Sequence, residues 1–169
     1  MCGGRPRRRL FSDMKIGIVT DTHDRWAVVR SIVECFTARG VSHILHAGDI
    51  MSPEVVEMFG AVKGATLIGV LGNCDTERLS LMEAAKRAGG QMHSQRFEGV
   101  VGERSVLMGH DPARVLHRIA GGGYDLAVYG HTHAQDIHTE GGTLVVNPGA
   151  RGVVIVETDD MTYETVPVE

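Results

Sequence analysis

The feature that most constrains this sequence is a pattern that occurs five times. A short apolar, β-branched run ends, and a residue that can offer a nitrogen or oxygen atom to a metal follows at once. The first run, residues 15–20, leads to Asp21 and His23. Because successive residues of an extended chain point to opposite faces, these two side chains point the same way and form half of a metal site. Seven residues share such a position: Asp21, His23, Asp49, Asn73, His110, His131 and His133.

Each of these residues has a simpler interpretation when it is taken alone. Asp21 could cap the helix that follows, and His23 could be an ordinary loop histidine. The metal interpretation is favoured because the pattern returns at five strand ends, most of them beside a glycine. The remaining histidines are interpreted as structural or have no ligand context: His43, His46, His93, His117 and His138.

The spacing of apolar residues predicts alternating strands and helices in the first half of the chain. Helices are expected over residues 26–39, from Pro53 with Ser52 as its cap, and over residues 81–88. Repeated strand–ligand–helix units are typical of a parallel α/β sheet. Later elements are expected as a strand over 92–97, a strand and helix over 105–119, a strand over 125–129, and hairpins to 166. We expect two sheets packed face to face with helices outside, and the site at the carboxyl ends of the strands.

Composition limits the class of protein. With 169 residues, 43% of them hydrophobic, the chain is long enough for one domain with a core, expected over residues 14–169. Residues 1–13 are expected to be a disordered basic leader. They hold four arginines and one aspartate, so the net charge of −4 becomes −7 for the rest, which argues against general nucleic-acid binding.

Two further observations concern the setting of the protein. No apolar run approaches the ~20 residues that a membrane-spanning helix needs, so no membrane partner is expected. The cysteines, Cys2, Cys35 and Cys74, are odd in number and lack CxxC spacing. A reduced, cytoplasmic setting is therefore expected.

The chemistry of the seven ligand residues indicates two metal ions. Carboxylate, amide and imidazole ligands without thiolates suit Mn²⁺, Ni²⁺, Fe²⁺, Co²⁺ or Zn²⁺ rather than a cysteine-rich structural zinc. Seven ligands are too many for one such ion, but they suffice for two ions that share a bridging carboxylate, typically ~3.5–4 Å apart.

As a set, these motifs resemble the five motifs of the calcineurin-like metallophosphoesterases. They are Asp21-x-His23, Gly48-Asp49, Gly72-Asn73, Gly109-His110 and Gly130-His131-x-His133. The short chain, with Gly-Asn-Cys-Asp at 72–75 and Asn-Pro-Gly-Ala at 147–150, resembles the small YfcE-like phosphodiesterase branch, which is similar to the retromer subunit Vps29. The resemblance implies a four-layer α/β/β/α sandwich.

The family pattern also implies a division of the ligands between two ions, with Asp49 as the bridge. One ion would be held by Asp21, His23, Asp49 and His133. The other would be held by Asp49, Asn73, His110 and His131.

The expected activity is hydrolysis of a small phosphodiester. Two cations, Mn²⁺ first, would activate a bridging water as the nucleophile, and Asn73 and His131 would offset the charge that grows on the phosphate oxygens. Diesters are favoured over monoesters because the motifs contain no arginine to hold a dianion, and Arg25 and Arg151 are interpreted as solvated. The alternatives are a non-catalytic Vps29-like scaffold and a monoesterase for a small metabolite. The sequence also leaves open whether the substrate is a nucleotide and whether the chain forms a homo-oligomer.

One position departs from the pattern of many relatives. They carry histidine after the motif asparagine, where it assists the leaving group, and here that residue is Cys74. A buried thiol with a raised pKa is a poor proton donor, so Cys74 is interpreted as a packing residue. Protonation of the leaving group is left open.

Overall fold

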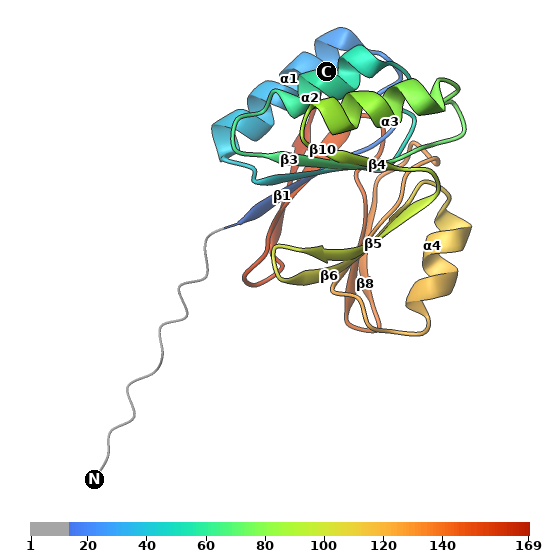
Figure 1. Cartoon of the computed structure of the whole chain (residues 1–169). Coiled ribbons are helices and arrows are strands. Elements are labelled where there is room, and N and C mark those ends of the chain that lie inside the picture. Colours follow the sequence, from blue (N-terminus) through green and yellow to red (C-terminus); the bar gives the residue numbers. More distant parts are fainter. Residues whose placement is uncertain (1–13) are drawn as a thin grey trace.

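The computed structural model describes residues 14–169. The leader predicted over residues 1–13 lies outside the described residues. Two β-sheets pack face to face, three helices cover the outer face of one sheet, and a fourth helix covers the other (Figure 1). The expected α/β/β/α sandwich is confirmed. Within residues 14–169, no helix is long and apolar enough to cross a membrane.

The first sheet has six strands in the order β11-β10-β1-β2-β3-β4. Strands β1 to β4 run parallel, β10 pairs antiparallel with β1, and β11 pairs antiparallel with β10. Its strands are β1 Lys15–Val19, β2 His43–His46, β3 Thr66–Val70, β4 Gln91–His93, β10 Gly152–Glu157 and β11 Tyr163–Pro167. The helices that connect its parallel strands are α1 Trp26–Arg39, α2 Pro53–Gly60 and α3 Arg78–Arg87.

The second sheet has five strands in the order β5-β6-β7-β9-β8. Strands β6, β7 and β9 are parallel, and β5 and β8 flank them antiparallel. Its elements are β5 Arg96–Val101, β6 Arg104–Gly109, α4 Pro112–Ile119, β7 Leu126–Val128, β8 Asp136–Glu140 and β9 Thr143–Asn147.

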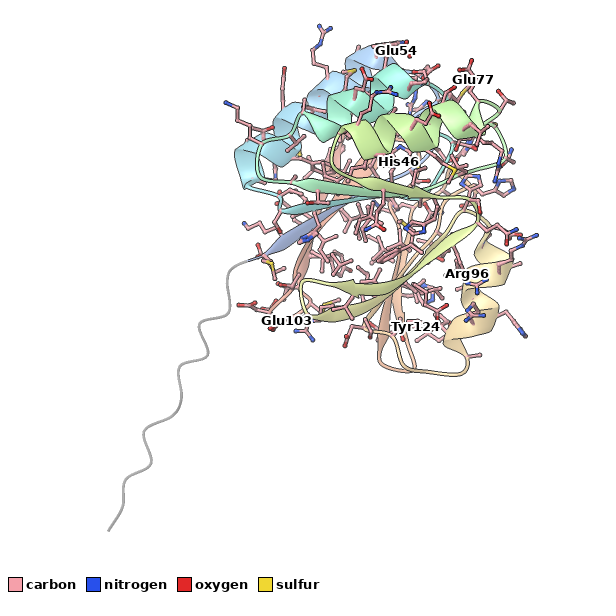
Figure 2. All side chains as sticks on the ribbon, in the orientation of Figure 1. His46, Glu54, Glu77, Arg96, Glu103 and Tyr124 are labelled. Carbon is pink, nitrogen blue, oxygen red and sulfur yellow. The ribbon has the colours of Figure 1, made fainter. Side chains whose placement is uncertain are left out.

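Alternation along the strands divides the apolar side chains between layers. In β1, Ile16 and Ile18 face the second sheet, whereas Val19 packs with Phe36 of α1 and the other helices of the first sheet. Side chains fill the space between the two sheets (Figure 2). Each fully buried aliphatic side chain of this kind stabilises the fold by roughly 1.5–3 kcal/mol.

The single strand predicted over residues 92–97 is wrong. Strand β4 ends at His93 in the first sheet, and β5 begins at Arg96 in the second. The chain therefore crosses between the sheets inside the predicted strand. Strand propensity reports how well a residue fits a pleated surface, not which strand it pairs with, so the break leaves no mark on composition.

The helix starts also differ in detail from the sequence pattern. Pro53 begins α2 as predicted, and Ser52 occupies the cap position, but its hydroxyl makes no capping hydrogen bond. Arg25 occupies the corresponding position before α1, so the alternative in which Asp21 caps this helix is wrong. Gly40 ends α1 in the left-handed conformation, as its glycine predicts.

Candidate metal centre

The loops that follow the parallel strands carry all seven predicted ligand residues to one edge of the sandwich. We call the loops after β1, β2 and β3 the first rim, and the loops after β6 and β7 the second rim. The first rim holds Asp21, His23, Asp49 and Asn73. The second rim holds His110, His131 and His133.

Four of these residues form one compact group across the two rims. Asp21, His23, Asp49 and His133 each place a ligand atom within 4.8 Å of the others. The Nε2 atoms of His23 and His133 are 3.4 Å apart, and His133 Nε2 lies 3.3 Å from Asp21 Oδ1. This group has the size and chemistry to hold one cation.

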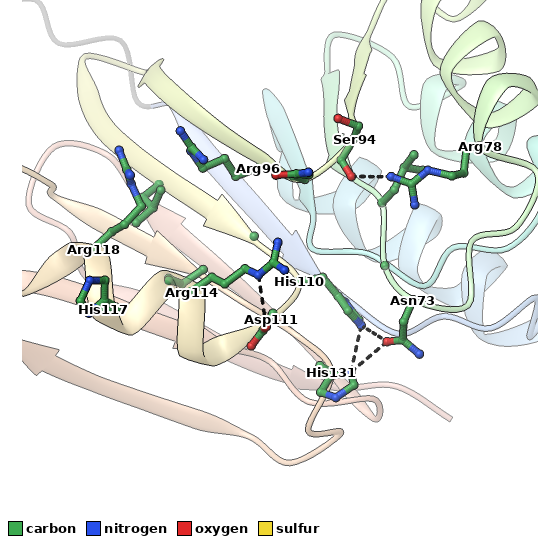
Figure 3. Close-up of a pocket in the computed structure, with 16 residues that line it drawn as sticks. Asn73, Arg78, Ser94, Arg96, His110, Asp111, Arg114, His117, Arg118 and His131 are labelled. Carbon is green, nitrogen blue, oxygen red and sulfur yellow. Dashed lines mark hydrogen bonds and ion pairs between the residues drawn. The ribbon is translucent and has the colours of Figure 1, made fainter.

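A second group lies beside the first and shares Asp49 with it. Asn73 Oδ1 lies 2.9 Å from both His110 Nε2 and His131 Nδ1, and Figure 3 shows these three side chains turned toward one another. Asp49 Oδ2 is 3.5 Å from His110 Nε2 and 3.7 Å from His23 Nε2. A single carboxylate oxygen therefore contacts both groups.

The hydrogen bonding of these residues fits bound cations. Asp21 Oδ1 is buried and accepts no hydrogen bond from any described residue, which is costly for a carboxylate unless a cation faces it. His110 Nδ1 lies 2.8 Å from the carbonyl oxygen of Ala47 and must donate to it. In the neutral ring, the Nε2 lone pair then faces the acceptor oxygen of Asn73, an arrangement that suits a metal between them.

Backbone conformation aims several of these side chains. Five of the seven have a left-handed φ: Asp21 (52°), His23 (45°), Asp49 (56°), His131 (71°) and His133 (59°). Such conformations cost free energy for a residue with a side chain, and they gather at functional sites. The motif glycines allow the loops to approach: a Cβ at Gly72 would lie 2.1 Å from Asp49 Oδ1.

Comparison with known proteins agrees with this geometry. The profile of the calcineurin-like phosphoesterase superfamily domain matches residues 14–167. The chain belongs to the calcineurin-like phosphoesterase superfamily. It is thereby a member of a class of phosphoester hydrolases.

Individual relatives in this superfamily extend over most of the chain. Phosphodiesterase MJ0936 of Methanocaldococcus jannaschii is 34% identical over 139 residues, which are 80% of this chain and 83% of the relative. A solved structure described as a novel archaeal phosphodiesterase has a TM-score of 0.85 at 28% identity and covers 92% of this chain and 100% of its own. The structure of the Escherichia coli phosphoesterase YfcE shares the fold, with a TM-score of 0.62 at 19% identity and coverage of 92% and 100%.

Asp75 supports the loops that carry the two ligand groups, and its role was not predicted. Its buried carboxylate accepts backbone hydrogen bonds from Asp49 (3.0 Å), Gly72 (2.7 Å) and Met51 (2.8 Å). It therefore ties the loops after β2 and β3 together. The sequence signal that could have revealed this role is the place of Asp75 in the Gly-Asn-Cys-Asp run at 72–75.

His46 and Arg25 fix the loop after β1. His46 Nδ1 accepts a hydrogen bond from Gly48 N at 3.2 Å, so Nε2 donates to Thr22 Oγ1 at 3.1 Å. Complete burial lowers the pKa of His46 to about 4, which keeps the ring neutral. Arg25 donates to the carbonyl oxygens of Thr22, Asp21 and Ala150, so its interpretation as a solvated side chain is wrong.

Cys74 is less buried than its sequence context indicates. It is partly exposed, and its backbone N–H donates to Asp49 Oδ1 at 2.8 Å. Hydrogen bonding to the Asp49 carboxylate is the main cause that raises the pKa of the Cys74 thiol, and desolvation raises it to a smaller extent. Cys74 thus helps to orient Asp49 through its backbone, whatever its side chain does.

A cavity of about 670 Å³ opens beside the second ligand group. Asn73, His110 and His131 form part of its wall. Four arginines also line it (Figure 3): Arg78, Arg96, Arg114 and Arg118. They lie outside every motif and come from α3, β5 and α4, so only the fold reveals that the site has arginines beside it.

Proposed function

We propose that the chain is a phosphodiesterase that depends on two divalent cations. The observation that carries this proposal is the position of Asp49, whose Oδ2 lies 3.7 Å from His23 Nε2 in one ligand group and 3.5 Å from His110 Nε2 in the other. A carboxylate placed between two ligand groups is the arrangement that a two-metal hydrolase requires. The 34%-identical relative, named a phosphodiesterase, supports the diester class.

We assign the ligands by their contacts. One cation would be held by Asp21, His23, Asp49 and His133. The other would be held by Asp49, Asn73, His110 and His131. Mn²⁺ is our first candidate because the ligands are nitrogen and oxygen atoms without a thiolate, and Ni²⁺, Fe²⁺, Co²⁺ and Zn²⁺ suit the same set.

When bound, such cations supply Lewis acidity and activate water for attack on phosphorus. The oxygen of water bonds to phosphorus and the water gives up a proton, while the P–O bond to the leaving group breaks and the leaving alkoxide takes up a proton. Asn73 and His131 belong to the ligand group that borders the cavity, so we assign them to the oxygens of the substrate phosphate. Their polar groups would offset the negative charge that develops there.

The ligand set also bears on the scaffold alternative. A scaffold needs no metal chemistry, yet all seven positions carry a competent ligand side chain, and the structure brings them together.

A reduced, cytoplasmic setting is part of our proposal. It is supported by Cys35 and Cys74, both of which are free thiols in the structure.

Metal analysis combined with a substrate panel tests this function. The protein is stripped with a chelator, verified to be metal-free, and titrated with Mn²⁺ while hydrolysis of bis(p-nitrophenyl) phosphate and p-nitrophenyl phosphate is followed. We expect two bound ions per chain, faster hydrolysis of the diester, and a higher melting temperature with metal, because ions that bind only the folded state stabilise it.

Each competing function predicts a different outcome of this experiment. Full activity of the metal-free protein contradicts the proposal. Two bound ions without turnover of any phosphoester favour the scaffold. Faster hydrolysis of the monoester favours the metabolite monoesterase.

A further inference from the structure

The cavity beside the second ligand group is strongly basic, although the chain is acidic. Residues 14–169 carry a net charge of −7, yet the charged side chains that line the cavity, apart from its histidines, are four arginines and Asp111. A cavity of about 670 Å³ is within the range of small-molecule sites.

Carboxylates near the cavity leave part of this positive charge unbalanced. Arg96 and Arg118 share one carboxylate, that of Glu98, at 3.5 and 2.9 Å. Arg114 faces Asp111 at 3.5 Å. Arg78 donates to the carbonyl oxygen of Ser94 at 2.7 Å and forms no ion pair with another described residue. Four guanidinium groups thus face two carboxylates.

The arginines converge from separate elements. Arg78 begins α3 and Arg96 begins β5, whereas Arg114 and Arg118 lie four residues apart on the same face of α4. In Figure 3, Arg96 and Arg118 lie away from Asn73 and His131, and Arg114 lies between Arg118 and His110. Guanidinium groups match phosphate oxygens in geometry and in charge, and they remain protonated at all relevant pH values.

We propose that this arginine pocket binds a second phosphate group of the substrate. The natural substrate class is then a small phosphodiester that carries a further phosphate on the part of the molecule that stays away from the metals. This inference rests on the proposed function, because the first phosphate is the one that is hydrolysed at the metal centre. The pocket extends from the ligand group to α4, so a scissile phosphate alone would leave the arginines of α4 without a role.

A matched pair of substrates tests the pocket. Thymidine 5′-(p-nitrophenyl phosphate) and its 3′-phosphorylated form share the scissile bond and the leaving group and differ by one phosphate. We expect kcat/KM to be about tenfold higher for the 3′-phosphorylated ester, mainly through a lower KM, because hydrogen bonds between charged groups are the stronger ones.

The variants Arg78→Ala and Arg114→Ala should each reduce this preference several-fold. Arg87→Ala is the matched control, since Arg87 lies on the same helix as Arg78 but pairs with Glu57 outside the pocket. It should keep the full preference. Calorimetric binding of thymidine 3′,5′-bisphosphate, compared with thymidine 5′-phosphate, gives a second readout that needs no turnover. The same two variants should weaken binding of the bisphosphate more than binding of the monophosphate.

The outcomes separate this inference from the proposed function. Hydrolysis of both esters at equal kcat/KM, with equal binding of the two nucleotides, overturns the second-phosphate pocket and leaves the phosphodiesterase intact. A preference that persists in both pocket variants also overturns it. If neither ester is hydrolysed by the Mn²⁺-loaded protein, the proposed function fails and this inference fails with it.

Discussion

The carboxylates of the first rim come from the interior, whereas two of the three imidazoles of the second rim lie near the surface, with His110 as the buried exception. Asp21 and Asp49 are 0% and 2% exposed, but the side chain of His133 is 55% exposed, and His131 is exposed as well. Buried carboxylates give strong, fixed ligands at a high desolvation cost. Exposed imidazoles cost little to hold and leave room for a substrate to approach.

The two rims are also supported differently. In the first rim, buried groups hold the ligands: Asp75 binds the backbone of Asp49, and Thr20 Oγ1 donates to Asp21 Oδ2 at 2.7 Å. In the second rim, Asn147 is also buried, but it holds the neighbours of His131 rather than a ligand, by donating to Gly130 O at 3.3 Å and to Thr132 Oγ1 at 2.9 Å. Substitutions in the first rim should therefore have the larger effects.

The largest difference is expected between Asp49→Asn and His133→Ala. Asp49→Asn keeps the shape but removes the charge shared by both ligand groups, so kcat/KM should fall by on the order of 10³-fold, with loss of bound metal. His133→Ala removes one exposed ligand and should cost roughly 10–100-fold. Metal content and steady-state kinetics of the two variants measure the difference. Near-normal turnover of Asp49→Asn with two bound ions would show that Asp49 is not the bridge.

Stability at acidic pH should depend on the buried His46 beneath the first rim. In the unfolded chain its imidazole takes up a proton near its usual pKa of 6.5, but in the folded chain it does so only at about 4. The free energy of unfolding should therefore fall as the pH drops from 6.5 to 4, by up to roughly 3 kcal/mol from this residue.

Thermal melts of the metal-free protein between pH 4 and 7 test this expectation. His46→Gln should flatten the pH dependence. His43→Gln on the same strand is the matched control. Burial also lowers the pKa of His43, but this side chain is only half-buried, so the variant should change the profile less. Parallel profiles for wild type and His46→Gln would contradict the role assigned to burial.

The first sheet was predictable because its signals are local. Each strand, ligand and helix follow one another within about thirty residues, and α1 begins and ends where its apolar spacing indicates. The second sheet was harder to predict because its first strand, β5, follows β4 in the chain but belongs to the other sheet, where it pairs with β6. The crossing at Ser94 and Gln95 depends on that pairing, which no local pattern encodes.

The same division applies to the candidate site. Its seven ligand residues stand beside strand ends and are visible in the sequence. Asp75 and the arginine pocket act through contacts that only the fold creates: Asp75 reaches the loop after β2, twenty-four to twenty-six positions earlier. Whether the seven ligands bind metal as assigned is still a prediction.

The contribution of Asp75 can be separated from general stability. Asp75→Asn should lower the free energy of unfolding by roughly 1–3 kcal/mol, because it disturbs three backbone hydrogen bonds, and should reduce metal affinity roughly 10–100-fold. Asp125→Asn is the matched control. Asp125 accepts hydrogen bonds from Ser105 N and Oγ. These contacts lie where β6 and β7 begin, at the ends of the two strands away from the candidate metal centre.

Denaturant melts and metal titrations of both variants measure the separation. Asp125→Asn should lose stability but retain metal affinity. Equal losses of metal affinity in Asp75→Asn and Asp125→Asn would mean that Asp75 acts only through stability and does not position Asp49.

The smallest effect is expected at Cys74, the first-rim residue that departs from many relatives. Its thiol has a raised pKa and is assigned no proton transfer, so Cys74→Ser should change kcat/KM little.

General acid assistance is worth ~10²–10⁴-fold and matters most for basic leaving groups. Without it, the wild-type rate should depend steeply on the leaving-group pKa, and Cys74→His should flatten this dependence. A series of aryl diesters measures the slopes. A shallow wild-type slope that steepens in Cys74→Ser would show instead that the thiol itself assists the leaving group, which would make this residue a catalytic part of the first rim.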